Sequence, residues 1–423
     1  ASVAILRLHK TKHSIQVADN QFNGSCRYSS LSPDRAISPQ SYSNRNTPNR
    51  DVWLIAKKDA RMNLTSENGQ DIDTKDDKPV PFGIQRFEAA CKRRGLRLRV
   101  LSAYDVDVEL KNDDISLNKV QRLSSKYLKE SRHGAQKKKK ILKNGNNDSA
   151  NGNDMTFNNK LPLFAIARTG SSSRFRELTF YRVLENLGVP VVNCPLSIEY
   201  CSNKFLTYSV LAANEIEIPH TVLVDAEHQE KDKNIDSKQI LKTHGLKLPL
   251  VLKIIGTCGG DGVFLVHTEK ELDQLLRMAI FFQPDAKMIV QECVVNSYGK
   301  DMRVWVAGDK VVGWVLRKND NKDEFRSNVH AGGRAHHIEL DEECKKIAVN
   351  ASLALGLDYC GVDLLFNGIN PKTGKESYKI AEVNSSPGWG PTVEQSCDFD
   401  LAESLLDHIC EKYNIPVECK DKP

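Results

Sequence analysis

Three side chains near the C-terminus have the types and spacing needed to bind a hard metal ion. Glu382 and Asn384 lie two residues apart in a stretch rich in Val, Ile and Tyr, which predicts a β-strand with both side chains on one face. Asp363 lies in a similar stretch at 361–366, and the turn-forming residues 367–374 predict a hairpin that brings Asp363 to that face. Two carboxylates and an amide carbonyl are oxygen ligands of the kind that Mg²⁺ binds.

The alternative is a pair of exposed strands that carry ordinary polar residues. Ile380, Ala381 and Val383 surround Glu382 and favour a buried strand. A carboxylate in such a strand needs a partner, because burying a charge without one is costly. We therefore favour a binding site over a solvated surface.

A second group of residues is suited to binding phosphate. Residues 256–262 contain four glycines, which would let backbone amides close over a phosphate, although a simple β-hairpin turn fits this segment equally well. The segment lies between two predicted strands and lacks a Gly-Lys-Ser/Thr ending, so a Walker-type NTPase is not predicted. Lys253 precedes it in an apolar strand and needs an anion there, unless it is an edge lysine that reaches solvent.

Alternating strands and helices must position these groups, and they predict an α/β (α+β) protein. A small α/β domain is expected over 51–199, opening with a strand at 52–56, a helix at 84–94 and a strand at 96–101. Residues 111–160 hold 12 Lys or Arg against 5 Asp or Glu, and they predict a disordered basic insertion. A solvated charge run is favoured there over a nuclear-localisation or polyanion-binding segment.

The second block spans 200–415 and alternates strands with helices. Helices are expected at 203–214, 269–279, 341–355 and 400–413. The expected strands are 220–224, 248–255, 263–266, 288–295, 302–306 and 310–316, besides the two strands of the C-terminal hairpin.

Composition excludes several classes of protein. The 423 residues are 40% hydrophobic and 27% charged, as in ordinary globular proteins, and no apolar run approaches the roughly 18 residues of a membrane span. The 11 cysteines include no C-x2-C pair, which argues against a zinc ribbon or a secreted disulfide framework and favours a reducing, cytoplasmic location. The net charge of +5 is concentrated in the insertion, so a nucleic-acid partner is not expected. Residues 1–50 are expected to be a disordered extension, or alternatively a mitochondrial targeting segment.

The C-terminal motif identifies a family resemblance. Asp363 with the run Glu-Val-Asn-Ser-Ser-Pro-Gly at 382–388 resembles the metal-binding end of ATP-grasp ligases of the RimK-like type, which add glutamate to ribosomal protein. The segment 194–206 resembles the animal branch that makes N-acetylaspartylglutamate or β-citrylglutamate. The resemblance implies a pre-ATP-grasp domain followed by an ATP-grasp domain, with the nucleotide held between subdomains at about 200–268 and 269–415.

The resemblance also assigns roles to residues of this chain. It implies two Mg²⁺ or Mn²⁺ ions held by Asp363, Glu382 and Asn384. It implies that the ATP phosphates are bound by the glycine-rich loop, which closes over them, and by polar side chains. The residues concerned are Lys204, Lys253, Gly259, Gly260, Ser327 and Asn328. It implies an adenine hinge made of Gln291, Glu292, Cys293 and Val294, with Asp301 at the ribose. The catalytic arginines, which would stabilise the transferring phosphate, are Arg303 and Arg326, although a surface ion pair fits Arg303 equally well.

The activity implied is an ATP-dependent ligation of glutamate, or a similar amino acid, to a carboxylate through an acyl phosphate. The acceptor would be a small carboxylate or a protein C-terminus. Two alternatives stay open, namely a protein-tail glutamylase that uses the basic insertion and a non-catalytic nucleotide-binding scaffold of the synapsin kind. A zinc site at His330, His336 and His337 is not favoured, because no cysteine or carboxylate lies at a ligand spacing beside them. The sequence leaves the oligomeric state open.

Overall fold

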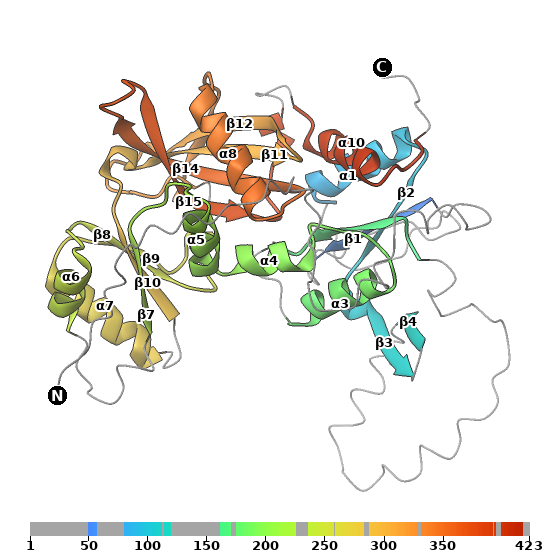
Figure 1. The fold of residues 1–423 in the computed structure, drawn as a ribbon, viewed down its shortest axis with the longest axis horizontal. Coiled ribbons are helices and arrows are strands. Elements are labelled where there is room, and N and C mark those ends of the chain that lie inside the picture. The colour runs from blue at the N-terminus through green and yellow to red at the C-terminus, as the bar shows by residue number, and fades with distance from the viewer. Residues whose placement is uncertain are drawn as a thin grey trace, which may run out of the picture. The chain divides into compact units, whose positions relative to one another are not determined.

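The structure is a computed structural model, and it describes residues 50–56, 80–111, 114–119, 161–170, 175–225, 236–257, 259–282, 287–328, 331–391, 393–394 and 399–417. The expectations for residues 1–49, and for most of the basic insertion, lie outside this range. Within it, helices accompany four β-sheets, as expected for a mixed α/β protein (Figure 1).

The first sheet is parallel and has the order β2-β1-β5-β6. Its strands are β1 (Asp51–Ala56), β2 (Arg97–Leu101), β5 (Phe164–Arg168) and β6 (Val191–Val192). Helices α1 (Phe82–Arg93) and α3 (Phe175–Asn186) cover opposite faces, since alternate residues of β1 pack against one helix or the other. The strands and helices of this region thus form an α/β arrangement, and its being a separate domain stays a prediction.

A two-stranded ribbon lies between β2 and β5 in the chain. It consists of β3 (Val106–Lys111) and β4 (Asp114–Lys119), which pair antiparallel. Leu117 of β4 is fully buried against the core that contains Trp53. The expectation of a disordered insertion from residue 111 is therefore wrong for β4, because the buried apolar residues of this short strand outweigh the polar composition around them.

The second sheet is antiparallel and has the order β7-β10-β8-β9. Its strands are β7 (Thr221–Asp225), β8 (Leu250–Ile254), β9 (Val263–Val266) and β10 (Lys287–Glu292), and the helices α6 (Ser237–His244) and α7 (Glu269–Phe282) pack on it. The sheets therefore change between Glu292 and Lys300, whereas we expected a subdomain boundary at 268/269. The position of β10 depends on non-local pairing, which local periodicity does not reveal.

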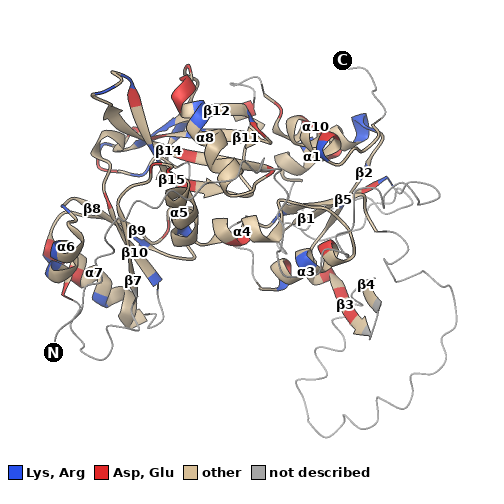
Figure 2. Cartoon of the chain, in the orientation of Figure 1, with Lys and Arg blue, Asp and Glu red and all other residues tan. Residues whose placement is uncertain are grey.

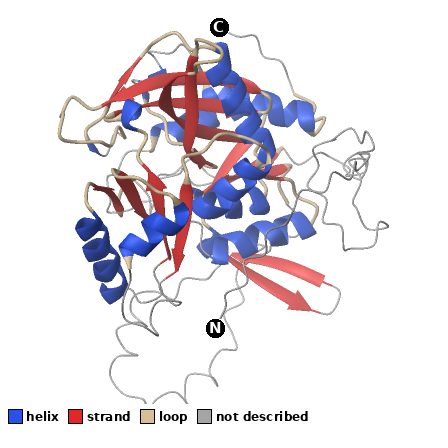
Figure 3. Ribbon diagram, turned by 60° about the vertical axis from the view of Figure 1, so that its left-hand side comes forward, coloured by secondary structure: helices blue, strands red, loops and turns tan. Residues whose placement is uncertain are grey.

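The third sheet carries the predicted C-terminal hairpin and has the order β13-β12-β11-β14-β15. Figure 3 shows how the described strands gather into sheets with helices beside them. Its strands are β11 (Lys300–Ala307), β12 (Lys310–Lys318), β13 (Arg334–His336), β14 (Tyr359–Ile369) and β15 (Glu376–Asn384). Helices α5 (Lys204–Ala213) and α8 (Glu342–Ala354) contribute to the core on one of its faces. Asp363 pairs with Glu382, as the sequence predicted.

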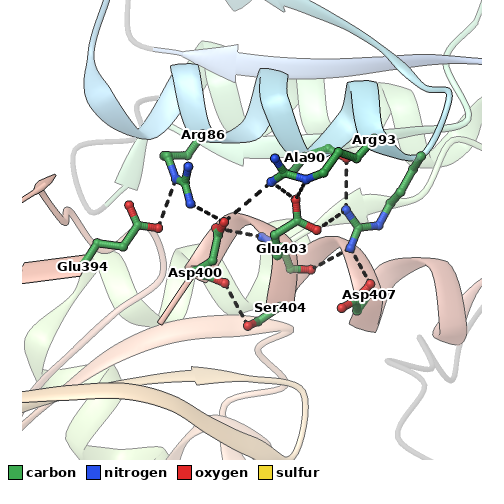
Figure 4. Close-up of polar contacts among 9 residues, drawn as sticks. Arg86, Ala90, Arg93, Glu394, Asp400, Glu403, Ser404 and Asp407 are labelled. Atoms are coloured by element: carbon green, nitrogen blue, oxygen red, sulfur yellow. Dashed lines mark hydrogen bonds and ion pairs between the residues drawn. The ribbon is translucent and has the colours of Figure 1, made fainter. Parts of the chain in front are cut away.

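The last helix, α10 (Leu401–Lys412), returns to the first sheet and packs beside α1 (Figure 1). Glu403 accepts hydrogen bonds from Arg93 and Arg94, and Asp400 accepts one from Arg86 (Figure 4). A helix that follows the third sheet in sequence thus joins the core of the first.

Charges of both signs are distributed over the described elements of all three large sheets (Figure 2). Within the described part of the chain, no helix has the length and apolar content needed to cross a membrane.

Candidate active site

One face of the third sheet carries a row of charged residues that come from different strands. Met302 and Val304 pack into the core that contains α8, so Asp301 and Arg303 of β11 point to the opposite face. Pairing places Arg317 of β12 beside Asp301, and it places Asp363 of β14 beside Arg303. The row ends at Glu382 of β15, which pairs with Asp363.

The centre of this row is a buried ion-pair network. Arg303 donates from Nη2 to Asp363 Oδ2 at 2.8 Å and also from Nε to Oδ1, while Arg317 Nη2 lies 3.0 Å from Oδ2. Burial by itself would raise the pKa of Asp363, but the two guanidinium groups hold it below the usual range. Arg303 therefore forms a buried ion pair in this structure, and its contact with the transferring phosphate stays a prediction.

Asp301 is likewise paired with an arginine. It is buried, and both of its carboxylate oxygens accept hydrogen bonds from Arg317, with 2.7 Å between Arg317 Nε and Asp301 Oδ1. This arrangement favours a structural role for Asp301 over the expected contact with a ribose. Arg317 was not identified from the sequence alone, because its partner Asp301 lies on the neighbouring strand β11 and is brought to it only by strand pairing.

Glu382 and Asn384 are the more open oxygen donors. The Glu382 side chain is one-third exposed, and Lys204 Nζ lies 3.5 Å from its Oε1. The Asn384 amide nitrogen is buried and has no hydrogen-bond partner among the described residues, and the same is true of Ser385 Oγ. A buried donor such as the Asn384 amide nitrogen needs an acceptor, and an oxygen of a bound substrate would provide one. The oxygens of Asp363, Glu382 and Asn384 are of the chemical type that a hard divalent cation binds, and those of Asp363 are paired with Arg303 and Arg317 in this structure.

The two lysines expected at phosphates lie near the glycine-rich segment. Lys204, at the start of α5, donates to the carbonyl of Thr257 at 2.9 Å. Lys253 is buried on β8 and donates to the Tyr208 hydroxyl at 3.1 Å. Among the described residues, no carboxylate forms an ion pair with Lys253. It is thus a buried cation held by a neutral partner, which suits later contact with an anion.

The glycine-rich segment contacts the loop that follows β12. Arg326 Nη1 donates to the Gly260 carbonyl at 3.1 Å, and Asn328 Nδ2 donates to the Gly259 carbonyl at 2.6 Å. Ser327 between them is buried. Tertiary structure therefore brings the loop after β12 against the glycine-rich segment. Arg326 and Asn328 donate hydrogen bonds to the backbone of that segment.

The expected adenine hinge borders a cavity of about 420 Å³. Glu292, Cys293 and Val294 line it together with Lys379, and Lys379 forms an ion pair with Glu292. Gln291 does not line the cavity, because its side chain is buried and donates to Thr221 Oγ1 at 2.6 Å. Three of the four expected hinge residues thus border one space at the junction of the second and third sheets.

Comparison with known proteins identifies relatives of this chain. Residues 201–409 match the model of the RimK-like ATP-grasp domain. The chain is 31% identical over 252 residues to a protein named probable alpha-L-glutamate ligase from Saccharophagus degradans, which covers 59% of this chain and 77% of that protein. It is 32% identical over 232 residues to N-acetylaspartylglutamate synthase A from Mus musculus, which covers 55% of this chain and 57% of that protein.

Solved structures support the fold. The ATP-grasp ligase PsnB complexed with minimal precursor is similar with a TM-score of 0.53 at 16% identity, covering 86% of this chain and 99% of that one. A RimK domain ATP-grasp protein from Sphaerobacter thermophilus has a TM-score of 0.52 at 13% identity, covering 85% and 98%. The expected ATP-grasp fold is confirmed.

Proposed function

Because this chain belongs to the RimK-like ATP-grasp family and is an ATP-grasp ligase, we propose that it joins L-glutamate, or a similar amino acid, to a carboxylate through an acyl phosphate. The observation that supports this most is Glu382, a one-third exposed carboxylate that lies 3.5 Å from Lys204 Nζ and shares its strand with Asn384. In this reaction the acceptor carboxylate attacks the γ-phosphate of ATP and ADP leaves. The amine of glutamate then attacks the acyl carbon, and phosphate leaves.

The residues that would hold two Mg²⁺ or Mn²⁺ ions are Asp363, Glu382 and Asn384. When bound, such ions neutralise the phosphate oxygens and align attacking and leaving groups. Within this chain, Arg303 and Arg317 keep Asp363 ionised by lowering its pKa. An ionised carboxylate is the form that a hard cation needs.

The nucleotide would lie between the second and third sheets. The backbone at Glu292, Cys293 and Val294 would bind the adenine edge in the cavity that these residues line. Lys204 and Lys253 would neutralise the phosphates: Lys253 has a neutral partner, the Tyr208 hydroxyl, and Lys204 has one carboxylate neighbour, Glu382, at 3.5 Å. Arg326 and Asn328 would keep the glycine-rich segment closed over the phosphates and exclude water, which would otherwise hydrolyse the acyl phosphate.

The relatives bear the names of a ligase and a synthase, which favours turnover over the non-catalytic scaffold. They leave two acceptor classes. N-acetylaspartylglutamate synthase A points to a small carboxylate, whereas a precursor is bound by PsnB and points to a peptide. A cytoplasmic location stays a prediction.

An isotope experiment tests the mechanism. The protein is incubated with ATP, Mg²⁺, glutamate and acceptors labelled with ¹⁸O in the carboxylate: N-acetylaspartate, citrate and an acidic peptide. Attack by the carboxylate transfers one labelled oxygen to the released phosphate, and mass spectrometry detects both this phosphate and the glutamyl product. Unlabelled phosphate would mean that water attacks ATP, and the acyl-phosphate mechanism would be abandoned.

Alkylation of Cys293 tests the nucleotide site without relying on turnover. Cys293 is half-buried at the hinge cavity, and burial raises its pKa, so labelling by a maleimide should be slow but measurable. Bound ATP should slow labelling of the Cys293 peptide, while labelling of Cys194, which is also half-buried but lies outside the cavity, should not change. Equal labelling of Cys293 with and without ATP would contradict adenine binding at this cavity.

A further inference from the structure

The loop that follows β15 is held by side chains from the first sheet. This loop, Ser385 to Gly388, comes directly after Asn384, the last of the candidate metal ligands. Neighbouring strands β5 and β6 of the first sheet are parallel, so their carboxyl ends meet at one edge. Arg168 ends β5 and Asn193 follows β6, which places both at this edge.

Asn193 is fully buried and uses its whole amide on backbone of the third-sheet region. Its Nδ2 donates to the carbonyls of Tyr359 at 2.8 Å and Ser385 at 2.7 Å. Its Oδ1 accepts from the backbone nitrogens of Asp358 at 2.7 Å and Tyr359 at 3.0 Å. One side chain thus joins the start of β14 to the first residue after β15. A buried network with all its donors and acceptors satisfied is rigid and specific.

Arg168 holds the same loop two residues further on. Its Nη1 donates to the Pro387 carbonyl at 3.0 Å. Its guanidinium carbon lies 5.2 Å from the ring centroid of Trp389, 5.9 Å from that of Phe87 and 6.0 Å from that of Tyr359. Aromatic faces attract a guanidinium, so they fix the direction in which Arg168 donates.

Between these two contacts the loop passes close to Gly170, which follows β5. A Cβ atom added to Gly170 would lie 3.4 Å from Ser386 Cβ, in van der Waals contact. The loop is therefore fixed at Ser385 and Pro387 and bordered by Gly170 at Ser386. It lies at the carboxyl edge of a parallel sheet, where ligands of α/β proteins commonly bind, and it adjoins the candidate metal site.

We propose that Asn193 and Arg168 are positioning residues through which the first sheet sets the place of the acceptor carboxylate relative to the γ-phosphate. The proposal rests on the proposed ligase function. The two side chains would act through the loop and not on the reacting atoms. Their loss would displace the acceptor while leaving the nucleotide cavity, which lies at the junction of the second and third sheets, unchanged.

Arg168→Gln removes the charge and the aromatic contacts, whereas Arg168→Lys keeps a charge and one donor. Arg182→Gln is the matched control, because Arg182 lies in the same domain, on α3, and pairs with Glu199 at 2.7 Å. Asn193→Asp is a second test, which removes the two donors to carbonyls with little change in shape. If Asn193→Asp does not fold, the Arg168 variants still decide.

The first readout is hydrogen exchange of the peptide that spans residues 384–390, measured in the full chain without substrates. We expect exchange to be about tenfold faster in Arg168→Gln, intermediate in Arg168→Lys and unchanged in Arg182→Gln and in peptides of the hinge. Unchanged exchange in this peptide, or equal acceleration throughout the protein, would overturn the proposal.

The second readout is kinetic. Arg168→Gln should raise the acceptor KM by roughly tenfold or more and leave the KM for MgATP within about twofold, because misplacement affects the displaced substrate. A variant that is merely less stable would not show this difference, and equal effects on both KM values would refute the proposal. If the wild type ligates nothing, the proposed function fails, and hydrogen exchange still decides whether the loop is held as described.

Discussion

The carboxylates on the third sheet differ in how their charge is balanced, and this difference separates their roles. Asp301 is buried with both of its oxygens paired to Arg317, whereas Glu382 is one-third exposed with Lys204 3.5 Å away. A carboxylate with an incompletely satisfied charge is the better candidate for direct contact with a bound cation. Substitutions at the two kinds of site should therefore have different consequences.

Glu382→Gln should reduce the rate of ligation on the order of a hundredfold with the melting temperature nearly unchanged, because it removes one ligand charge from an open position. The measurement is ADP release at saturating and at limiting Mg²⁺. Glu343→Gln, an exposed residue of α8, is the control. Near-normal ADP release at limiting Mg²⁺ would exclude Glu382 as a metal ligand.

Arg317→Met should destabilise the protein by about 3–5 kcal/mol, because it leaves Asp301 buried without its partner. Adding Asp301→Asn in the same chain should recover part of that loss, since the uncompensated charge is then gone. Urea unfolding of the two variants and the wild type measures this. Stability equal to that of the wild type in Arg317→Met would show that the network is solvated.

At the scale of elements, the glycine-rich segment between β8 and β9 depends on one close approach. Gly260 has a φ of +89°, and a Cβ atom there would lie 2.8 Å from Asn328 Nδ2. Residues with a side chain are disfavoured at this φ. The hydrogen bond from Arg326 to the Gly260 carbonyl holds the segment near the loop after β12. The segment therefore combines a backbone requirement with a steric one.

Gly260→Ala should raise the KM for ATP several-fold, by roughly the equivalent of 1 kcal/mol, because the loop closes less well. Gly374→Ala is the matched control, since Gly374 has a φ of +68° with no atom within 4 Å of an added Cβ. Steady-state kinetics in ATP separates the two. The same KM in both variants would mean that the approach to Asn328 does not matter for nucleotide binding.

At the scale of the whole described molecule, α10 connects the third sheet to the first through charged contacts. Asp358, just before β14, is buried and lies 3.0 Å from His408 Nε2 and 2.6 Å from Lys412 Nζ. Burial acts to raise the pKa of Asp358, but these two partners together lower it below the ordinary value. Because the folded-state pKa is the lower one, folding favours the ionised form.

Asp358→Asn should therefore cost about 1–3 kcal/mol of unfolding free energy at pH 7. The contribution of the ionised form is complete above the unfolded pKa of 3.8 and is lost as the pH falls through the lower folded value. The difference between wild type and variant should shrink below roughly pH 4. Urea midpoints measured from pH 7 to pH 3 test this, and a constant difference would show that the charge is not what stabilises the contact.

The sequence alone determined features that depend on neighbouring residues. The C-terminal hairpin, the shared face of Glu382 and Asn384, and the pairing of Asp363 with Glu382 follow from strand alternation and a turn of fixed length. The parallel opening sheet follows from strands that alternate with helices.

Tertiary structure decided what depends on residues distant in sequence. Arg317 is a partner of Asp301 only through the pairing of β11 with β12. The place of β10 between β7 and β8 likewise depends on pairing with strands distant in sequence. The hold of Asn193 on Ser385 joins residues that no local pattern connects. Local periodicity fixes which way a side chain points along its own strand, whereas the partner that it meets is set by packing of the whole chain.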